Sequence, residues 1–338
     1  MNSAGPRPVR RFANSLIDRL PAPRDRAARQ VLRSTRDLVT GRAAPAAVPE
    51  KKTKKPAKKA AEQKVTRGAK VFAVPGSYNS PIVDVSEIRG AGSDAGTLVE
   101  MPGIDLDPAR HDAVWREWRP FVERWKDQAP AAVRRYHSDN NMFGPHSAAM
   151  LAGALGSIRP RRYMEIGSGF SSAVVLDVND EQRPDDPILC TFIEPYPDRL
   201  NSILRPADHD RCTILVEKVQ DVDLEVFDQL ESGDILFIDS SHIAKSGSDL
   251  LHEIFEVLPR LAPGVFIHFH DIMYPFDYPL KWMVKQNRSW NEPYFLRAFL
   301  MYNPEFTVHF WTDFHALFGS QTDDEQVDRA SSLWLRRT

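Results

Sequence analysis

The sequence predicts an α/β fold in which helices cover both faces of a doubly wound, mostly parallel sheet. Three observations lead to this prediction. Short apolar runs alternate with helical patterns through the second half of the chain, glycines follow the first run, and acidic side chains follow the others. Apolar runs of this kind are typical of parallel strands that are buried on both faces.

Five apolar runs are predicted to form the parallel strands, and they read RRYMEI, CTFIE, CTILVE, DILFID and GVFIHF. The segments between them have helical patterns, as in SSAVVLDVND, PDRLNSILR and SDLLHEIFEVLPRL. The chain closes with FTVHFW and HALFGS, which are predicted to pair as a C-terminal β-hairpin at the edge of the sheet. We therefore expect a seven-stranded, Rossmann-like core over residues 146–338.

A helical segment is expected to precede this core. Residues Trp115, Trp118, Val122 and Trp125 recur at helical spacing in DAVWREWRPFVERW, which favours a buried helix face over an aromatic substrate box. The segment GPHSAAMLAGALGSI predicts a second helix rich in small residues. Residues 76–145 are assigned to a helical cap, so that residues 76–338 form one domain.

The N-terminal residues 1–75 differ from this domain in charge and composition. Residues 1–70 carry 19 Lys and Arg against 5 Asp and Glu, which leaves 25 basic and 41 acidic residues in the remaining chain. Two short amphipathic stripes, in VRRFANSLIDRL and RAARQVLRSTRDLV, precede a low-complexity Ala/Lys/Pro stretch. We expect a largely disordered basic arm that binds an anionic membrane surface or a partner protein. Nucleic acid is disfavoured, because the arm lacks interleaved aromatic residues and the domain is acidic.

Composition limits the cellular context. No uncharged apolar run approaches the roughly 20 residues that a transmembrane helix needs, and charges interrupt the N-terminus where a signal peptide would be apolar. The two cysteines, Cys190 and Cys212, are too few for a disulfide framework. These features predict a cytoplasmic protein, which the arm could hold at the inner face of the membrane. The oligomeric state stays open.

The first predicted strand ends in the glycine turn MEIGSGFSS. Gly167 and Gly169 permit a tight turn and let a ligand approach the backbone closely. Glu165 precedes the turn, and Ser168 and Ser171 lie within it. The pattern departs from the full dinucleotide motif GxGxxG, because a serine holds the position of the third glycine.

Acidic side chains follow the second and third predicted strands. Glu194 could accept hydrogen bonds from ribose hydroxyls, and Asp221 could accept one from an exocyclic amine such as that of adenine. No Lys or Arg lies in the glycine turn. Together these features favour a ligand that contains a nucleoside but no phosphates.

A second set of polar residues follows the fourth and fifth predicted strands. Asp239 and His242 end the fourth, and His268, His270 and Asp271 end the fifth. Adjacent parallel strands would bring these side chains to one place. Carboxylate oxygens suit Mg²⁺, whereas histidine shifts the preference toward Mn²⁺, Fe²⁺ or Zn²⁺.

The combination resembles the class I S-adenosylmethionine-dependent methyltransferases over roughly residues 140–320. Their motif E/D-x-G-x-G matches Glu165, Gly167 and Gly169, and Ser171 stands where a third glycine is sometimes found. The resemblance implies S-adenosylmethionine as cofactor, with Glu194 on the ribose and Asp221 on the adenine.

The second set is similar to that of metal-dependent O-methyltransferases that act on macrolide sugars and rhamnose-type sugars. In that family an Asp and an acidic pair hold Mg²⁺, and a His three residues after the Asp is the general base. The resemblance implies Asp239, His270 and Asp271 as metal ligands and His242 as base. Asp239 is also expected to act in catalysis and to bind the cofactor. The resemblance also implies a hydroxyl of a sugar or glycoconjugate as acceptor. His270 departs from the family pattern, which leaves Mg²⁺ and Mn²⁺ both open.

Two other functions remain open from the sequence. A transition-metal hydrolase or oxygenase could use His242, His268, His270 and Asp271. A non-catalytic scaffold could keep the fold and recruit partners through the arm. For the acceptor pocket, the segments RYHSDNNMFG and MYPFDYPLKW offer aromatic and amide side chains, among them Tyr136, Asn140, Asn141, Phe143, Tyr274, Phe276 and Tyr278.

Overall fold

The structure is a computed structural model that describes residues 72–88, 98–127, 134–320 and 330–338. Nearly all of the predicted basic arm, including both amphipathic stripes, lies outside the described residues. Among the helices that the structure does describe, none combines the length and apolar character that spanning a bilayer requires.

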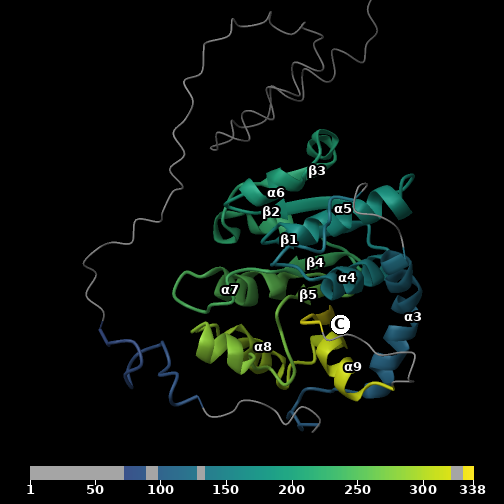
Figure 1. Ribbon diagram of the computed structural model, residues 1–338. Helices are drawn as coiled ribbons and strands as arrows, with labels where there is room; N and C mark the ends of the chain where they lie inside the picture. Colours follow the sequence, from purple (N-terminus) through teal and green to yellow (C-terminus); the bar gives the residue numbers. More distant parts are fainter. Residues whose placement is uncertain (1–71, 89–97, 128–133, 321–329) are drawn as a thin grey trace, which may run out of the picture. The chain divides into compact units, whose positions relative to one another are not determined.

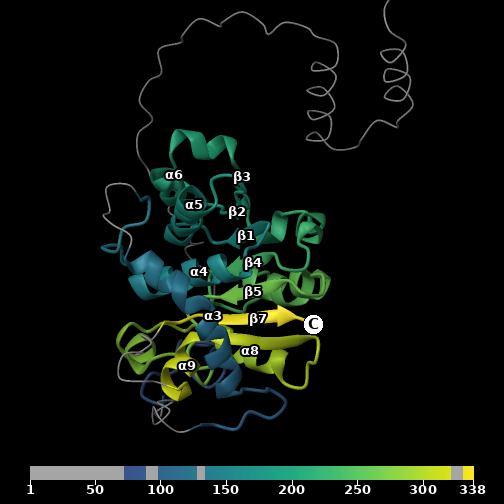
Figure 2. The ribbon, with the colours of Figure 1, turned by 90° about the vertical axis from the view of Figure 1, so that its right-hand side faces the viewer.

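The prediction of a seven-stranded, mostly parallel sheet is confirmed. The strands lie in the order β3-β2-β1-β4-β5-β7-β6, and Figure 2 shows β3, β2, β1, β4, β5 and β7 one below another from the top of the sheet. Figure 1 shows the same order from β3 to β5. Only the pairs that involve β7 are antiparallel. The strand bounds are β1 Arg162–Ile166, β2 Leu189–Ile193, β3 Cys212–Leu215, β4 Ile235–Ile238, β5 Phe266–Phe269, β6 Phe306–Trp311 and β7 Leu333–Arg337.

Each face of the sheet has its own hydrophobic core. Along β4, Ile235 and Phe237 belong to one core, and the alternate residues Leu236 and Ile238 belong to the other. The first core includes side chains of α3 (Pro108–Asp127), α4 (Pro145–Ile158) and α5 (Phe170–Gln182). The second includes residues of α7 (Asp249–His252) and α8 (Glu292–Leu300). Figure 1 shows α4 and α7 on opposite sides of the sheet.

The tryptophan stripe of the N-terminal segment lies on α3 and packs against the sheet. Trp118, Val122 and Trp125 are buried, and Trp115 is half-buried. Trp118 contacts Trp334 of β7 with ring centroids 5.2 Å apart. The interpretation of this stripe as a core face is therefore confirmed.

The prediction of a strand at HALFGS is wrong, because most of this segment belongs to the helix α9 (Thr312–Phe318). Phe314 and Phe318, four residues apart, lie on one side of the helix with ring centroids 5.1 Å apart. The neighbour of β6 in the sheet is instead β7, which inserts between β5 and β6. An antiparallel C-terminal strand pair exists as expected, but its second strand comes from the last residues of the chain.

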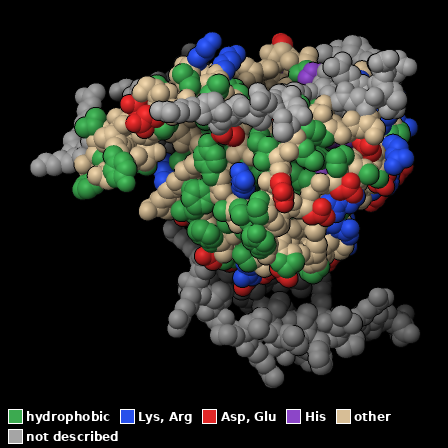
Figure 3. Space-filling view, turned by 90° about the horizontal axis from the view of Figure 1, so that it is seen from below, with side chains coloured by type: hydrophobic (Ala, Val, Ile, Leu, Met, Phe, Trp, Pro, Cys, Tyr) green, Lys and Arg blue, Asp and Glu red, His purple; other side chains and the backbone are tan. Residues whose placement is uncertain are grey.

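The remaining elements are short. They are α6 (Asp198–Ile203), the 3₁₀ turns Pro206–Asp210, Val219–Asp221, Leu224–Gln229 and Leu258–Arg260, and the π-helical turns Glu253–Val257 and Lys281–Lys285. The single helix expected over residues 248–261 is thus α7 followed by a π turn and a 3₁₀ turn. Figure 3 shows hydrophobic side chains gathered on the face seen from below. Exposed apolar residues of the described chain include Tyr294 and Phe295 on α8, and Tyr302 just beyond it.

Candidate active site at the carboxyl ends of the strands

The glycine turn after β1 is packed directly against the end of β4. Gly167 has a φ of +85°, and a Cβ at this position would lie 1.9 Å from the carbonyl oxygen of Asp239. The backbone N–H of Asp239 donates to the carbonyl of Ile166 at 2.9 Å. Only glycine satisfies both the left-handed backbone and this close approach. The two predicted site segments are therefore neighbours.

Glu165 lies beneath the turn as a fully buried side chain. It accepts hydrogen bonds from the hydroxyls of Ser171 and Ser172, and the Ser172 hydroxyl in turn accepts one from the N–H of Gly169 at 3.0 Å. Burial raises the pKa of Glu165 to about 8, although both hydroxyls oppose this shift. The hydrogen bonds between Ser171 and Glu165, and those through Ser172, thus hold the glycine turn in place.

Ser168 is the turn residue whose side chain is left available. Its hydroxyl oxygen is buried, and it has no hydrogen-bond partner among the residues that the structure describes. Buried polar atoms are nearly always paired, so an unpaired hydroxyl beside a glycine turn indicates a position for a ligand. Arg199 of α6 lies beside the turn, 3.1 Å from the position of a Cβ at Gly169. Sequence reasoning did not identify Arg199, because it lies outside the glycine motif.

The acids after β2 and β3 lie at the same edge of the sheet. The N–H of Gly167 donates to Ile193, and the N–H of Glu194 donates to Leu215, both at 3.0 Å, so the three strand ends are level. The half-buried Glu194 accepts a hydrogen bond from the N–H of Tyr196 at 2.7 Å. Asp221 is exposed at the end of its 3₁₀ turn. No contact in the structure assigns either acid to a ligand, and their cofactor roles stay predictions.

His242 is held between two carboxylates. Its Nδ1 lies 2.6 Å from Oε2 of Glu292, and its Nε2 lies 3.4 Å from Oδ1 of Asp239. Both His242 and Glu292 are buried. Glu292 begins α8, fifty residues away in sequence, and sequence reasoning missed it because its partner is set only by the fold. The arrangement fixes the imidazole with one nitrogen anchored and the other facing Asp239.

Charge interactions dominate this pair. Burial would lower the pKa of His242, but Glu292 and Asp239 outweigh burial and raise it well above its ordinary value. Burial would raise the pKa of Asp239, yet His270 and His242 lower it below its ordinary value. These interactions favour the protonated imidazole and the ionised form of Asp239.

Two site residues have left-handed backbones. His242 has a φ of 61° and Asp271 a φ of 58°. Such conformations are uncommon for residues other than glycine and cluster at functional sites. His242 lies in the turn after β4 and Asp271 in the turn after β5, at the edge of the sheet where the glycine turn also lies.

The strand-five residues divide between the site and the core. The imidazole of His270 lies 3.5 Å from Asp271, measured from Nε2 to Oδ1, and Asp271 accepts a hydrogen bond from the Ser331 hydroxyl at 2.8 Å. His268, by contrast, stacks on Phe237 at 4.0 Å and contacts Trp334 at 4.7 Å, measured between ring centroids. Core aromatic residues therefore pack against His268. Its role as a transition-metal ligand stays a prediction.

The predicted metal ligands do not form a complete ligand set. Within the described ranges, no group of three or more His, Cys, Asp or Glu side chains lies close enough together to hold a metal ion. Asp239, His270 and Asp271 occur instead in separate contacts with His242, with one another and with Ser331. The divalent cation stays a prediction.

The predicted acceptor residues also divide. Tyr136, Tyr274 and Phe276 are buried within the cores. Phe143 and Tyr278 are also buried, but Phe143 contacts His270 and Tyr278 contacts Trp290. The aromatic side chain nearest the imidazole is Trp290, whose ring centroid lies 4.4 Å from that of His242. Sequence reasoning missed Trp290, which lies in the short segment QNRSWNEP without helical or strand periodicity.

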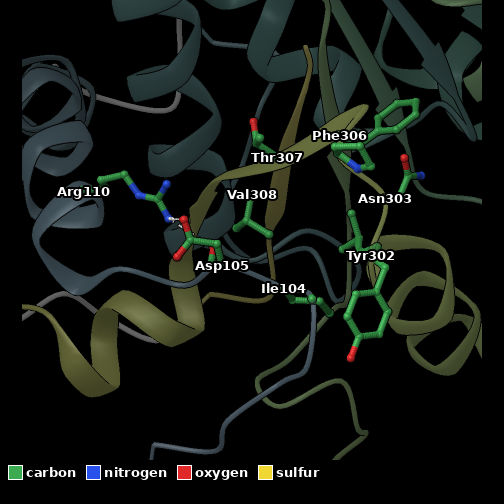
Figure 4. Close-up of a pocket in the computed structure, with 11 residues that line it drawn as sticks. Ile104, Asp105, Arg110, Tyr302, Asn303, Phe306, Thr307 and Val308 are labelled. Carbon is green, nitrogen blue, oxygen red and sulfur yellow. Dashed lines mark hydrogen bonds and ion pairs between the residues drawn. The ribbon is translucent and has the colours of Figure 1, made fainter.

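A separate pocket of about 440 Å³ lies at the β6 edge of the sheet (Figure 4). Its wall includes Phe306 and Val308 of β6, Tyr302, and the ion pair of Asp105 with Arg110 at 2.9 Å. It contains none of the predicted site residues and is distinct from the candidate active site.

Comparison with known proteins identifies the class. Residues 164–272 match the family Methyltransf_24, described as a methyltransferase domain. This range begins within β1 and ends just after β5, so it includes the glycine turn, Asp239, His242 and Asp271. Together with the fold, the match defines the chain as a methyltransferase. The alternatives of a hydrolase, an oxygenase and a scaffold are thereby set aside.

A protein of Archaeoglobus fulgidus, described as uncharacterized, is 30% identical over 165 residues, which are 46% of this chain and 73% of that protein. The chain belongs to the same family as this archaeal protein.

Solved structures of methyltransferases resemble the chain only at low similarity. The methyltransferase PaMTH1 of Podospora anserina, with bound SAH, is 15% identical with a TM-score of 0.39, over 67% of this chain and 88% of that one. The D160 form of CmcI, with Mg and SAM, is 18% identical with a TM-score of 0.37, over 76% and 96% respectively. Similarity at this level carries no conclusion about the site of this chain.

Proposed function

We propose that this methyltransferase uses S-adenosylmethionine to methylate a hydroxyl of a sugar or glycoconjugate. The observation that carries the proposal is the His242 imidazole, anchored by Glu292 beside the glycine turn. The site thereby combines a backbone surface that a ligand can approach with a proton acceptor at a fixed position.

The residues around the glycine turn fit the cofactor. Glycine at positions 167 and 169 lets the turn lie close to Asp239 and Arg199, and the buried Ser168 hydroxyl lacks a partner within the described part of the chain. Glu194 lies at the same edge of the sheet as the turn, where its carboxylate could accept hydrogen bonds from ribose hydroxyls. When bound, S-adenosylmethionine supplies a methyl group on a sulfonium, which an oxygen nucleophile displaces in line.

The protein's part is to hold the acceptor and accept its proton. A new C–O bond forms as the C–S bond breaks, and the hydroxyl proton must leave the acceptor oxygen. His242 Nε2 is the nitrogen that faces the site, so it is assigned this proton. Before it can accept this proton, the imidazole must lose the proton that Glu292 and Asp239 stabilise on it. The positive charge of a bound sulfonium would lower the pKa of His242 and so favour this loss.

Metal assistance is a separate part of the proposal. A sugar hydroxyl is a weak nucleophile, and Mg²⁺ or Mn²⁺ near Asp239 would increase its acidity. Since the described residues form no three-ligand group, no step above depends on a metal. Calorimetric titration after chelation, followed by Mg²⁺ or Mn²⁺ addition, tests this part. A heat of metal binding that is absent in Asp239→Asn would support metal assistance. Cofactor binding and turnover that are unchanged after chelation would contradict it.

The first test of the proposed function is calorimetric titration of the full chain with S-adenosylmethionine and S-adenosylhomocysteine. We expect micromolar binding that is weakened at least tenfold in Glu194→Ala. Asp185→Ala is the matched control, because this exposed acid precedes β2 and lies at the opposite end of the strand. Absence of binding, or equal loss in both variants, would count against the proposal.

We also propose that the basic residues 1–70 bring a cytoplasmic enzyme to an anionic membrane surface. The support is their charge, 19 basic against 5 acidic residues. Sedimentation of the full chain with phosphatidylglycerol vesicles should decrease steeply with salt, and replacing the six lysines of residues 51–59 with glutamine should weaken it. Binding to neutral vesicles alone would contradict this proposal, and capture of a protein without vesicle binding would favour a partner instead.

A further inference from the structure

Arg288 contacts Trp290, the indole that lies against His242, and no carboxylate of the described residues pairs with its charge. The Arg288 guanidinium carbon lies 4.5 Å from the ring centroid of Trp282 and 4.4 Å from that of Trp290. Trp290 also contacts His242 on the ring. We propose that the acceptor carries an anionic group, a carboxylate or a phosphate, that pairs with Arg288 while the acceptor ring packs on Trp290. This inference rests on the proposed function and narrows its substrate class.

The backbone fixes Trp290 over the proposed base. The N–H groups of Asn291 and Glu292 both donate to the carbonyl of His242, at 3.1 and 3.3 Å. The side chain of Asn291 pairs with the backbone of Ala244 through contacts of 2.6 and 3.3 Å. Because these bonds tie residues 291–292 to residues 242–244, the indole is held beside the imidazole, as a positioned contact surface for an acceptor requires.

The charge of Arg288 is available to a ligand. Across the described ranges, no Asp or Glu lies within ion-pair distance of Arg288, although the side chain is only half-exposed. Arg135, in contrast, is paired with Asp177, Asp180 and Asp208. Stacking on indole faces leaves the N–H groups at the guanidinium edge free to donate to an anion. Arginine in this state binds carboxylates and phosphates through paired hydrogen bonds.

The other carboxylates of the site do not prevent an anion from binding there. Asp239 and Glu292 flank His242, and Asp271 lies beside His270 and accepts from Ser331. Ring contacts lead from His242 to Trp290 and from Trp290 to Arg288, and among the described residues none of these carboxylates forms an ion pair with Arg288. In the proposed arrangement the anionic group pairs with Arg288, and the reacting hydroxyl lies toward His242.

Tyr278 completes this surface. Its hydroxyl is buried and has no hydrogen-bond partner in the described part of the chain. Its ring centroid lies 5.5 Å from that of Trp290 and 5.9 Å from that of Trp282. A buried phenol without a partner indicates a position for an oxygen of the acceptor. The two indoles, the phenol and the guanidinium thus form a recognition surface for a polar ring with negative charge.

The test compares matched neutral and anionic ligands by calorimetry on the full chain, with S-adenosylhomocysteine present. The pairs are methyl glucoside with methyl glucuronide, methyl galactoside with methyl galacturonide, and glucose with glucose 6-phosphate. We expect at least one anionic member to bind about tenfold or more tightly than its neutral partner. The uronides and the phosphate distinguish the two sources of negative charge.

Two variants assign the preference to Arg288. In Arg288→Gln, the ratio of the affinities for the anionic and the neutral ligand should fall to nearly one. The affinity for S-adenosylhomocysteine should stay unchanged. Lys285→Gln is the control, because it removes an equal charge from an exposed position three residues earlier. If Arg288 had only a structural role, its replacement would weaken the binding of neutral and anionic ligands equally.

The inference is overturned if no anionic member binds more tightly than its neutral partner, or if Arg288→Gln keeps the preference. Failure of S-adenosylhomocysteine itself to bind would instead count against the proposed function. Because the sugar titrations are repeated without S-adenosylhomocysteine, the two failures are distinguishable.

Discussion

At the scale of single residues, the site depends on a histidine whose environment is built from distant parts of the chain. Glu292 anchors the Nδ1 nitrogen of His242, and Asp239 faces the Nε2 nitrogen. Glu292 does not face the acceptor position in this arrangement. We therefore assign it a positioning role, in which it orients the imidazole and sets its charge.

Replacing Glu292 with glutamine should separate these effects. The amide keeps the shape but removes the charge, so the pKa of His242 should fall, and methyl transfer should fall by about tenfold to a hundredfold through loss of orientation. NMR titration of the histidine ring protons reports the pKa, and the affinity for S-adenosylhomocysteine should stay unchanged. An unaltered His242 titration would contradict the positioning role.

Gly167 allows a second prediction, because two separate causes make it glycine. Gly167→Ala would place a Cβ 1.9 Å from the carbonyl of Asp239 and strain a φ of +85°. Gly233→Ala is the matched control, since its φ is +90° and nothing lies within 4 Å of the added Cβ. The control should cost about 1 kcal/mol of unfolding free energy from backbone strain. Urea denaturation should show a clearly larger loss for Gly167→Ala, together with loss of cofactor binding; equal losses would mean that the contact with Asp239 is unimportant.

Glu165 predicts a pH dependence of stability. Its pKa in the folded protein is about 8, against an ordinary value of 4.5. Between these values the folded state binds more protons than the unfolded state, so stability should fall as pH rises from about 4.5 to about 8 and then level off. Glu165→Gln stays neutral and should lose this part of the slope. Urea unfolding at pH 5.5 and pH 8.5 measures it, and identical slopes in both proteins would contradict the assignment.

At the scale of elements, Arg135 joins α5 to the segment around Asp208. Its guanidinium donates to Asp208 through Nε and Nη2, at 2.8 and 2.7 Å, and to Asp177 at 2.9 Å. Arg135 and Asp208 are buried. Despite burial, which acts in the opposite direction, the hydrogen bonds from Arg135 and Arg211 lower the pKa of Asp208 to about 2. Loss of one partner would leave an unpaired charge in the interior.

Asp208→Asn should consequently destabilise the protein by about 3 kcal/mol. In the wild type, the stability contributed by Asp208 is present above pH 3.8 and is lost as pH falls through about 2, so the variant should have a flatter acid limb. Asp228→Asn is the control, because it breaks the exposed pair with Arg260 and should cost less than about 1 kcal/mol. Similar losses in both variants, measured by urea unfolding at pH 7 and pH 3, would contradict this account.

At the scale of the whole molecule, the last strand, β7, takes an interior position in the sheet and not an edge. β7 lies between β5 and β6, and its residues Leu333, Trp334 and Leu335 are completely buried. Leu333 and Leu335 contribute to one core and Trp334 to the other. The C-terminal residues therefore connect the two faces of the fold.

Trp334→Ala should cost about 3–5 kcal/mol of unfolding free energy, since it removes a large side chain from a closed core. Phe255→Ala, at a position that is 60% exposed, is the control and should cost less than about 1 kcal/mol. Thermal and urea unfolding compare the two variants. A small effect at Trp334 would mean that β7 contributes little to the stability of the domain.

The sequence by itself determined the strands from β1 to β6, the glycine turn and the polar residues at the strand ends. Such features are local, because burial on both faces gives apolar runs, and chain reversal at a ligand site needs glycine. The same local reasoning failed at residues 315–320, where aromatic residues four apart pack as a helix and a remote strand takes the place beside β6.

Only the tertiary structure decided which groups meet. It placed Glu292 and Trp290 against His242, brought Arg288 onto Trp290, and enclosed His268 among core aromatic residues. Some of these contacts join residues fifty or more positions apart, as in Glu292 with His242 and Trp334 with His268, and others depend on which face of a strand is covered. Spacing along the chain does not encode such contacts, because they arise when the strands take their order in the sheet and the segment 288–292 folds over the end of β4.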